Sequence, residues 1–227
     1  GPEFDGALVD WDEMFKRMGT FKKVEREDLE HFQEHLDTVE PIITKYTTDI
    51  VMDVAPTDDP IEVLIDRDAQ WRKDLRTTMK PKDRTKIERV QMPELDPVYR
   101  ATTRTEEVNK GLTKEMALTE AKRCLDCAKP TCVEGCPVNI NIPSFIKNIE
   151  RGQFLAAAKV LKNTSALPAV CGRVCPQEKQ CESRCIHLKM KEPAVAIGYL
   201  ERFAADYERE SGNISLPEMA PANSIKV

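Results

Sequence analysis

The sequence predicts a mainly α protein: a helical domain over residues 111–212, preceded by an irregular, partly helical N-terminal connector. Two observations lead to this prediction. Apolar residues in the C-terminal half recur at helical spacing between Pro and Gly positions that start and stop helices. All eight cysteines also lie in that half, between Cys124 and Cys185. The 227 residues are enough for one or two domains with a buried core.

The connector shows only weak structural signals. Residues 1–40 have helical spacing of apolar residues in a highly charged context, which predicts a helix. The β-branched runs at 42–51 and 61–65 are weak strand signals, interrupted by prolines. Residues 67–110 are polar and rich in proline, so we expect an extended, partly ordered connector that wraps a partner domain.

Four helices are predicted in the cysteine-bearing half. Capping side chains, prolines at first helical positions and glycines past the last turn mark their ends. The expected start and stop positions are Thr113 and Cys124, Pro143 and Gly152, Phe154 and Leu161, and Pro193 and Gly212.

The cysteines form two groups of four. The first is Cys124-x2-Cys127-x4-Cys132-x3-Cys136-Pro137, and the second is Cys171-x3-Cys175-Pro176-x5-Cys181-x3-Cys185. Tetrahedral iron takes thiolate ligands, so these groups predict two 4Fe–4S clusters. In bacterial two-cluster ferredoxins the Cys that precedes Pro binds the other cluster, and we expect the same crossing here.

With this crossing, cysteines from both groups can be assigned to the two clusters. The first cluster takes Cys124, Cys127, Cys132 and Cys185. The second cluster takes Cys136, Cys175 and Cys181, and its fourth ligand is not fixed by the spacing.

Other uses of the thiols are less favoured. A disulfide scaffold is typical of small secreted domains, and no signal peptide is visible. Zinc modules usually show two C-x2-C pairs, whereas this chain has one. A zinc-stabilised protein-docking module nevertheless remains the alternative function from another class.

Charge and glycine spacing exclude several functions. The net charge is −5 without a long basic run, so we expect no nucleic-acid partner. A mean hydropathy of −0.48, without an apolar run of about 20 residues, argues against a membrane partner and favours the cytoplasm. No G-x-G-x-x-G or P-loop pattern occurs, so we expect this chain alone not to oxidise NADPH.

Several stretches of residues 111–212 resemble one family. They are Arg123–Cys127, Gly135–Val138, Ile142–Ile146, Leu167–Pro176 and Gly198–Asp206. The family is the N-terminal iron–sulfur domain of the small subunit of NADPH-dependent glutamate synthase. This domain also occurs in dihydropyrimidine dehydrogenase and in flavin-bearing subunits of electron-bifurcating NADH-dependent ferredoxin:NADP oxidoreductases. The resemblance implies an α-helical ferredoxin-like domain whose two 4Fe–4S clusters pass electrons between an FAD, reduced by NADPH, and an acceptor flavin.

The resemblance also suggests the missing ligand. In the family a side-chain oxygen from the last helix binds one cluster, at the position that matches Glu201. Helical spacing places Glu201 on an apolar stripe, where a carboxylate is costly unless it is paired or bound to metal. The alternative is a buried ion pair with Arg173 or Arg202. If Glu201 is the ligand, Cys171 is spare; otherwise Cys171 is a possible alternative ligand.

The two ends of the chain resemble neighbouring domains. Residues 1–10 resemble the tail of the ferredoxin-NADP reductase-like subunit of bifurcating enzymes, and a cloning remnant is the alternative. Ser224–Val227 resembles the first strand of an FAD domain. We therefore expect three parts: an extension (1–110), a two-cluster domain (111–212), and a linker with the start of a truncated FAD-binding domain (213–227).

These parts imply partners. FAD and NADP would belong to a downstream domain of the same polypeptide. The other expected partner is the large glutamate synthase subunit, or a reductase-like subunit if the parent is a bifurcating oxidoreductase.

Overall fold

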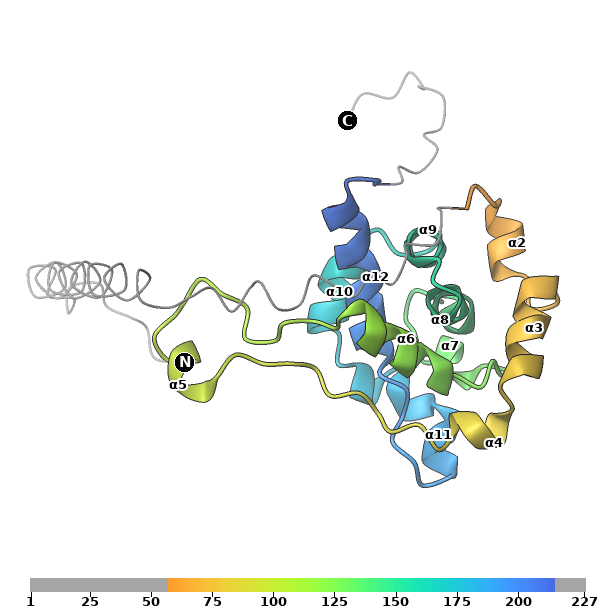
Figure 1. The fold of residues 1–227 in the computed structure, drawn as a ribbon, viewed down its shortest axis with the longest axis horizontal. Helices are drawn as coiled ribbons and strands as arrows, with labels where there is room; N and C mark the ends of the chain where they lie inside the picture. Colours follow the sequence, from red (N-terminus) through yellow and green to blue (C-terminus); the bar gives the residue numbers. More distant parts are fainter. Residues whose placement is uncertain (1–56, 215–227) are drawn as a thin grey trace, which may run out of the picture. The chain divides into compact units, whose positions relative to one another are not determined.

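Helices build the part of the chain that the computed structural model describes, residues 57–214 (Figure 1). Within this range the only β pairing is an isolated antiparallel bridge between Glu94 and Asn109, so the mainly α prediction is confirmed. The elements are α2 (Ile61–Ile65), α3 (Gln70–Thr78), α4 (Pro81–Arg84), α5 (Pro97–Arg100), α6 (Lys114–Arg123), α7 (Thr131–Glu134), α8 (Ile142–Glu150), α9 (Phe154–Lys162), α10 (Pro168–Val174), the 3₁₀ turns η3 (Gln177–Lys179) and η4 (Glu182–Arg184), α11 (Ile186–Lys189) and α12 (Ile197–Ser211).

Most predicted helix ends are confirmed. The Thr113 hydroxyl accepts a hydrogen bond from the Met116 N–H and caps α6, which ends at Cys124. Gly212 ends α12 in the left-handed conformation that glycine adopts without steric cost. The start of α12 differs, because it begins at Ile197 and not at Pro193.

Two carboxylates explain this later start. The Ala196 N–H donates to Glu120 and the Gly198 N–H donates to Glu182. Side-chain acceptors thus bind the backbone donors at the entry to α12, and Ala196 has a non-helical conformation. The segment before α12 is therefore buried in a non-helical path.

The strand signal at residues 61–65 is wrong, because this run forms helix α2. Ile61, Leu64 and Ile65 share one helical face, and Leu64 is fully buried in the core against α8 and α9. Burial of this face outweighs the β preference of its branched residues. The signals at 1–40, 42–51, 1–10 and Ser224–Val227 lie outside the described residues.

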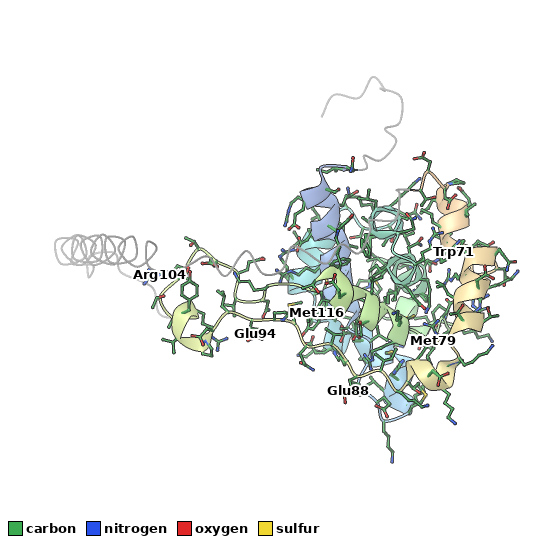
Figure 2. All side chains as sticks on the ribbon, viewed as in Figure 1. Trp71, Met79, Glu88, Glu94, Arg104 and Met116 are labelled. Atoms are coloured by element: carbon green, nitrogen blue, oxygen red, sulfur yellow. The ribbon has the colours of Figure 1, made fainter. Side chains whose placement is uncertain are left out.

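Residues 67–110 are less extended than expected, because they form α3, α4 and α5 and much of the segment packs against the helical body of the same chain. Arg72 of α3 and Arg84 of α4 are each 2% exposed. From Pro93 to Lys110 the chain instead runs away from the body as an arm that carries α5 at its tip (Figure 1). Glu94 and Arg104 mark this arm in Figure 2.

The core lies between α6, α8, α9 and α12. Its aromatic centre is Phe154, whose ring stands edge-on to Phe203 and Tyr207 at 5.1 and 4.9 Å between centroids. Burying each such large apolar side chain contributes about 1.5–3 kcal/mol. Among the described helices, none has the length and apolar character needed to cross a membrane.

Candidate metal centre

Four thiols line one pocket beside α8. Cys124 follows α6, Cys127 lies three residues further on, Cys132 belongs to α7, and Cys185 follows η4. Apolar side chains complete the wall, among them those of Ile142, Ile146 and Val195. The pocket therefore gathers the four cysteines that the sequence assigns to the first cluster.

Contacts between α7 and η4 bring Cys185 to the other three thiols. The Thr131 hydroxyl donates to the Arg184 carbonyl oxygen at 2.6 Å. Gly135 lies so close to this region that a Cβ there would stand 2.8 Å from the Gln180 carbonyl oxygen. The contacts at Thr131 and Gly135 thus bring the two cysteine segments together, as the predicted crossing requires.

The pocket disfavours free thiolates. Burial raises the pKa of Cys124 to about 11 and also raises the pKa values of Cys127 and Cys132, and neighbouring thiolates add to the effect. The positive charges of Lys147 and Arg67 act in the opposite direction, on Cys124 and Cys127. The raised pKa values keep these thiols protonated at neutral pH, so metal binding would release protons.

A second group comprises Cys136 after α7, Cys175 at the end of α10, Cys181 before η4 and Glu201 on α12. Burial raises the pKa of Cys175 to about 11 and that of Cys181 to about 12. The charges of Cys136 and Glu201 raise both values further. The groups predicted to bind the second cluster are therefore neighbours.

Glu201 has a buried carboxyl group with one oxygen that makes no hydrogen bond within the described part of the chain. Its residue is 5% exposed, and Oε1 has no hydrogen-bond partner among the described residues. Burial raises the pKa of Glu201 to about 7. Leaving such an oxygen unpaired costs roughly 1–3 kcal/mol, so this atom suits a metal ligand.

The structure pairs the two arginines that were considered for Glu201 with other groups. Arg173 binds Glu107 at 2.6 Å and Asp206 at 2.8 Å. Arg202 binds Glu107 at 2.8 Å and Asp206 at 3.3 Å. The described ion pairs thus offer no support for the ion-pair alternative.

Cys171 lies beside Cys175 at the edge of the second group. Its Sγ is 4.0 Å from the Ser165 hydroxyl, and a hydrogen bond with Cys171 contributes to the raised pKa of Cys175. The geometry therefore leaves Cys171 available as a packing residue or as an alternative ligand.

The arrangement of the candidate ligands bears on the choice between zinc and an iron–sulfur cluster. Among residues 57–214, no three His, Cys, Asp or Glu side chains are close enough to hold a single metal ion. Zinc draws its ligands to one ion, whereas each thiolate of a 4Fe–4S cluster binds a different iron atom. Four thiols around one pocket are the donor set that a 4Fe–4S cluster takes.

His187 lies in the wall of the first pocket and is fully buried. Its Nε2 is 3.0 Å from the Arg123 carbonyl oxygen, which can only accept, so Nε2 carries the proton. Its Nδ1 has no partner among the described residues. Burial lowers the pKa of His187, which keeps the ring neutral.

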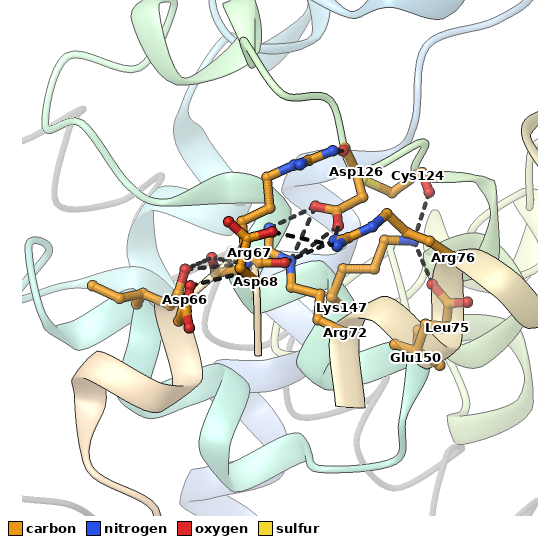
Figure 3. A network of polar contacts seen from close by, with 12 residues as sticks. Asp66, Arg67, Asp68, Arg72, Leu75, Arg76, Cys124, Asp126, Lys147 and Glu150 are labelled. Atoms are coloured by element: carbon orange, nitrogen blue, oxygen red, sulfur yellow. Dashed lines mark hydrogen bonds and ion pairs between the residues drawn. The ribbon is translucent and has the colours of Figure 1, made fainter. Parts of the chain in front are cut away.

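Sequence reasoning missed a polar network behind the first pocket (Figure 3). The carboxylate of Asp126 is fully buried and binds Arg72 and Arg76, each at 2.6 Å. Burial alone would raise the pKa of Asp126, but the two arginines outweigh it and hold this pKa below its usual range. The one signal of this network in the sequence is the position of Asp126, an acidic residue between the predicted ligands Cys124 and Cys127.

Comparisons with known proteins agree with this chemistry. A sequence model of the family described as dihydropyrimidine dehydrogenase domain II, 4Fe-4S cluster, matches residues 100–213. The chain is 43% identical over 101 residues to the putative oxidoreductase UacF of Escherichia coli, covering 44% of this chain and 16% of that protein. From the same organism, the NAD-dependent dihydropyrimidine dehydrogenase subunit PreT is 38% identical over 107 residues (47% and 26%), and the glutamate synthase [NADPH] small chain is 40% identical over 106 residues (47% and 22%). The chain thus spans about a quarter or less of the length of these relatives.

Proposed function

Because the chain belongs to the dihydropyrimidine dehydrogenase domain II, 4Fe-4S cluster family, we propose that residues 111–212 relay single electrons within a flavoenzyme. The parent enzyme would be an NADPH-dependent oxidoreductase of the glutamate synthase small-subunit type. When bound, two 4Fe–4S clusters supply the one-electron chemistry.

The observation that carries this proposal is the gathering of Cys124, Cys127, Cys132 and Cys185 around one pocket. These thiols come from two segments more than fifty residues apart in the chain. A local zinc or redox motif does not require ligands from two distant segments. A two-cluster ferredoxin domain does require them, because each cluster takes a ligand from the other segment.

The protein's own residues would hold the clusters and exclude water. Cys124, Cys127, Cys132 and Cys185 would bind the first cluster. The carboxylate of Glu201 would complete the second site, together with Cys136, Cys175 and Cys181. Apolar side chains of α8 line the first pocket, and the apolar surroundings of a cluster influence its reduction potential.

The partners follow from the family. FAD and NADP would lie in a downstream domain of the same polypeptide, and a large subunit or a reductase-like subunit would exchange electrons with the clusters. Relatives named as glutamate synthase small chain and as dihydropyrimidine dehydrogenase subunit support a multi-domain oxidoreductase. Residues 1–10, on which the bifurcating alternative depends, lie outside the described residues.

Metal and sulfide analysis of the chain, purified without oxygen, tests the proposal. We expect about eight iron atoms and about eight acid-labile sulfides per chain, with the visible absorption of iron–sulfur proteins. Zinc without sulfide would favour the docking-module alternative. A folded chain without iron would refute the proposal.

A further inference from the structure

Residues 61–84 precede the segment that the family model matches, yet they contact the loop between Cys124 and Cys127. The contacts come from arginines on and around α3 and α4 (Figure 3). We call these side chains the arginine clamp: Arg67, Arg72, Arg76 and Arg84.

Two members of the clamp bind the Asp126 carboxylate. Arg72 donates from Nη2 to Oδ1 at 2.6 Å and from Nε to both oxygens at 3.1 Å. Arg76 donates from Nη1 to Oδ2 at 2.6 Å. Arg72 also donates to the Ser144 hydroxyl at 2.7 Å, which ties the loop to α8. A forked arginine–carboxylate pair is directional, so these bonds fix the loop's position.

The other two members bind backbone carbonyl oxygens of the same stretch. Arg67 donates from Nε and Nη2 to the Asp126 carbonyl at 3.4 and 3.2 Å. Arg84 donates to the Lys122 carbonyl at 2.7 Å and reaches the Cys124 carbonyl at 3.5 Å. Lys147 of α8 donates to the Cys124 carbonyl at 2.6 Å.

Positive charge exceeds negative charge around this loop. The clamp and Lys147 supply five cationic side chains, and the buried carboxylates that bind them are Asp126 and Glu150. Asp68 lies 3.9 Å from Arg76, but its side chain is 73% exposed and water screens its charge. Arg72, Arg84 and Lys147 are buried and Arg76 is 22% exposed, so water screens these charges less than that of Asp68 and the positive excess acts on the neighbouring pocket.

We propose that the arginine clamp holds the Cys124–Cys127 loop and raises the reduction potential of the first cluster. This inference rests on the proposed function. One-electron reduction adds one negative charge to the cluster, and fixed positive charge nearby stabilises the reduced form. The electron comes from a reduced flavin in the parent enzyme, or from dithionite in the experiment below. The four arginines are positioning residues, since their contacts are to the loop.

Two substitutions with opposite effects on charge test the inference in the full chain. Arg76→Gln removes a positive charge, so we expect the midpoint potential of the first cluster to fall. Asp126→Asn removes a negative charge, so we expect this potential to rise. Asn also tolerates the left-handed backbone of position 126, where φ is 55°. Damage to the loop alone would not produce shifts of opposite sign.

A redox titration followed by EPR measures both clusters in one sample. The signal that Cys127→Ser removes identifies the first cluster, and the second cluster is the internal reference, expected to stay unchanged. Arg100→Gln is the matched control, because Arg100 lies on the arm with its side chain 42% exposed and pairs with Glu94. We expect it to shift neither potential.

Shifts in the same direction for both variants, or unchanged potentials with iron retained, would overturn the inference. If either variant loses its iron, the same titration is made on Arg67→Gln. A lower midpoint potential of the first cluster in that variant supports the inference, and an unchanged potential overturns it. A wild-type chain without iron would instead refute the proposed function, so the two failures are distinguishable.

Discussion

Gly172 of α10 lies directly against Arg202 of α12: a Cβ at position 172 would stand 2.6 Å from the backbone nitrogen of Arg202. This approach matters because α10 carries Cys171 and ends at Cys175, whereas α12 carries Glu201. The distance between the two helices therefore sets the geometry of the second site.

Gly172→Ala should separate these helices. Backbone atoms cannot yield to the new methyl group, and overpacking of this kind costs about 1–3 kcal/mol. We expect a lower thermal midpoint and loss of the second cluster's EPR signal, with the first cluster retained. Gly212→Ala is the control, since position 212 has a φ of 72° but no atom within 4 Å of a new Cβ. That variant should lose some stability and keep both clusters; equal iron loss in both variants would contradict the packing explanation.

Cys127→Ser should remove the first cluster and spare the second. Cys127 lines the pocket with the three other thiols assigned to that cluster, and a hydroxyl replaces the thiolate poorly on iron. We expect iron content to fall by about half. Cys171→Ser, the comparison variant, should keep wild-type iron if Cys171 is spare. Iron loss in Cys171→Ser would make Cys171 a ligand.

Glu201→Ala should change the second cluster's EPR spectrum and leave the first unchanged. The reason is the unpaired, buried Oε1 beside Cys175 and Cys181. Glu210→Ala removes the same charge from an exposed position of the same helix and should have no effect. Identical spectra for Glu201→Ala and wild type would show that Glu201 is not a ligand.

His187 should make the protein sensitive to mild acid. Burial lowers its pKa below the usual 6.5, so between pH 6.5 and its lower folded pKa the unfolded state binds the extra proton. Stability is therefore full above pH 6.5 and falls as the pH drops through this window, by up to about 1.4 kcal/mol per pH unit.

Urea unfolding under argon at several pH values would measure this dependence. His187→Gln can still donate to the Arg123 carbonyl, because its Nε2 occupies the place of the histidine Nε2, but it does not titrate. We expect this variant to be less stable at neutral pH and to lose less stability on acidification. A slope equal to that of wild type would assign the acid sensitivity to other groups.

The sequence by itself determined the helical class and most ends of the four helices that it predicts. These features depend on local spacing: Thr113 caps the turn beside it, and Gly212 ends the helix it follows. The crossing of Cys185 to the first group is a prediction by analogy with bacterial two-cluster ferredoxins, and the pocket that gathers Cys185 with Cys124, Cys127 and Cys132 supports it.

Only the tertiary structure decided the surroundings of these groups. Arg72 reads in sequence as one charge on a polar helix, and its partner Asp126 lies 54 residues further along the chain. Helix α2 was read as a strand because its β-branched residues were weighed without the apolar face of α8 and α9 on which it packs. Likewise, the pairing of Arg173 and Arg202 with Glu107 and Asp206, which leaves Glu201 unpaired, depends on a fold that no local pattern encodes. Local propensity determines the backbone conformation over a few neighbouring residues. Ion pairs and burial depend instead on which distant segments of the chain come into contact.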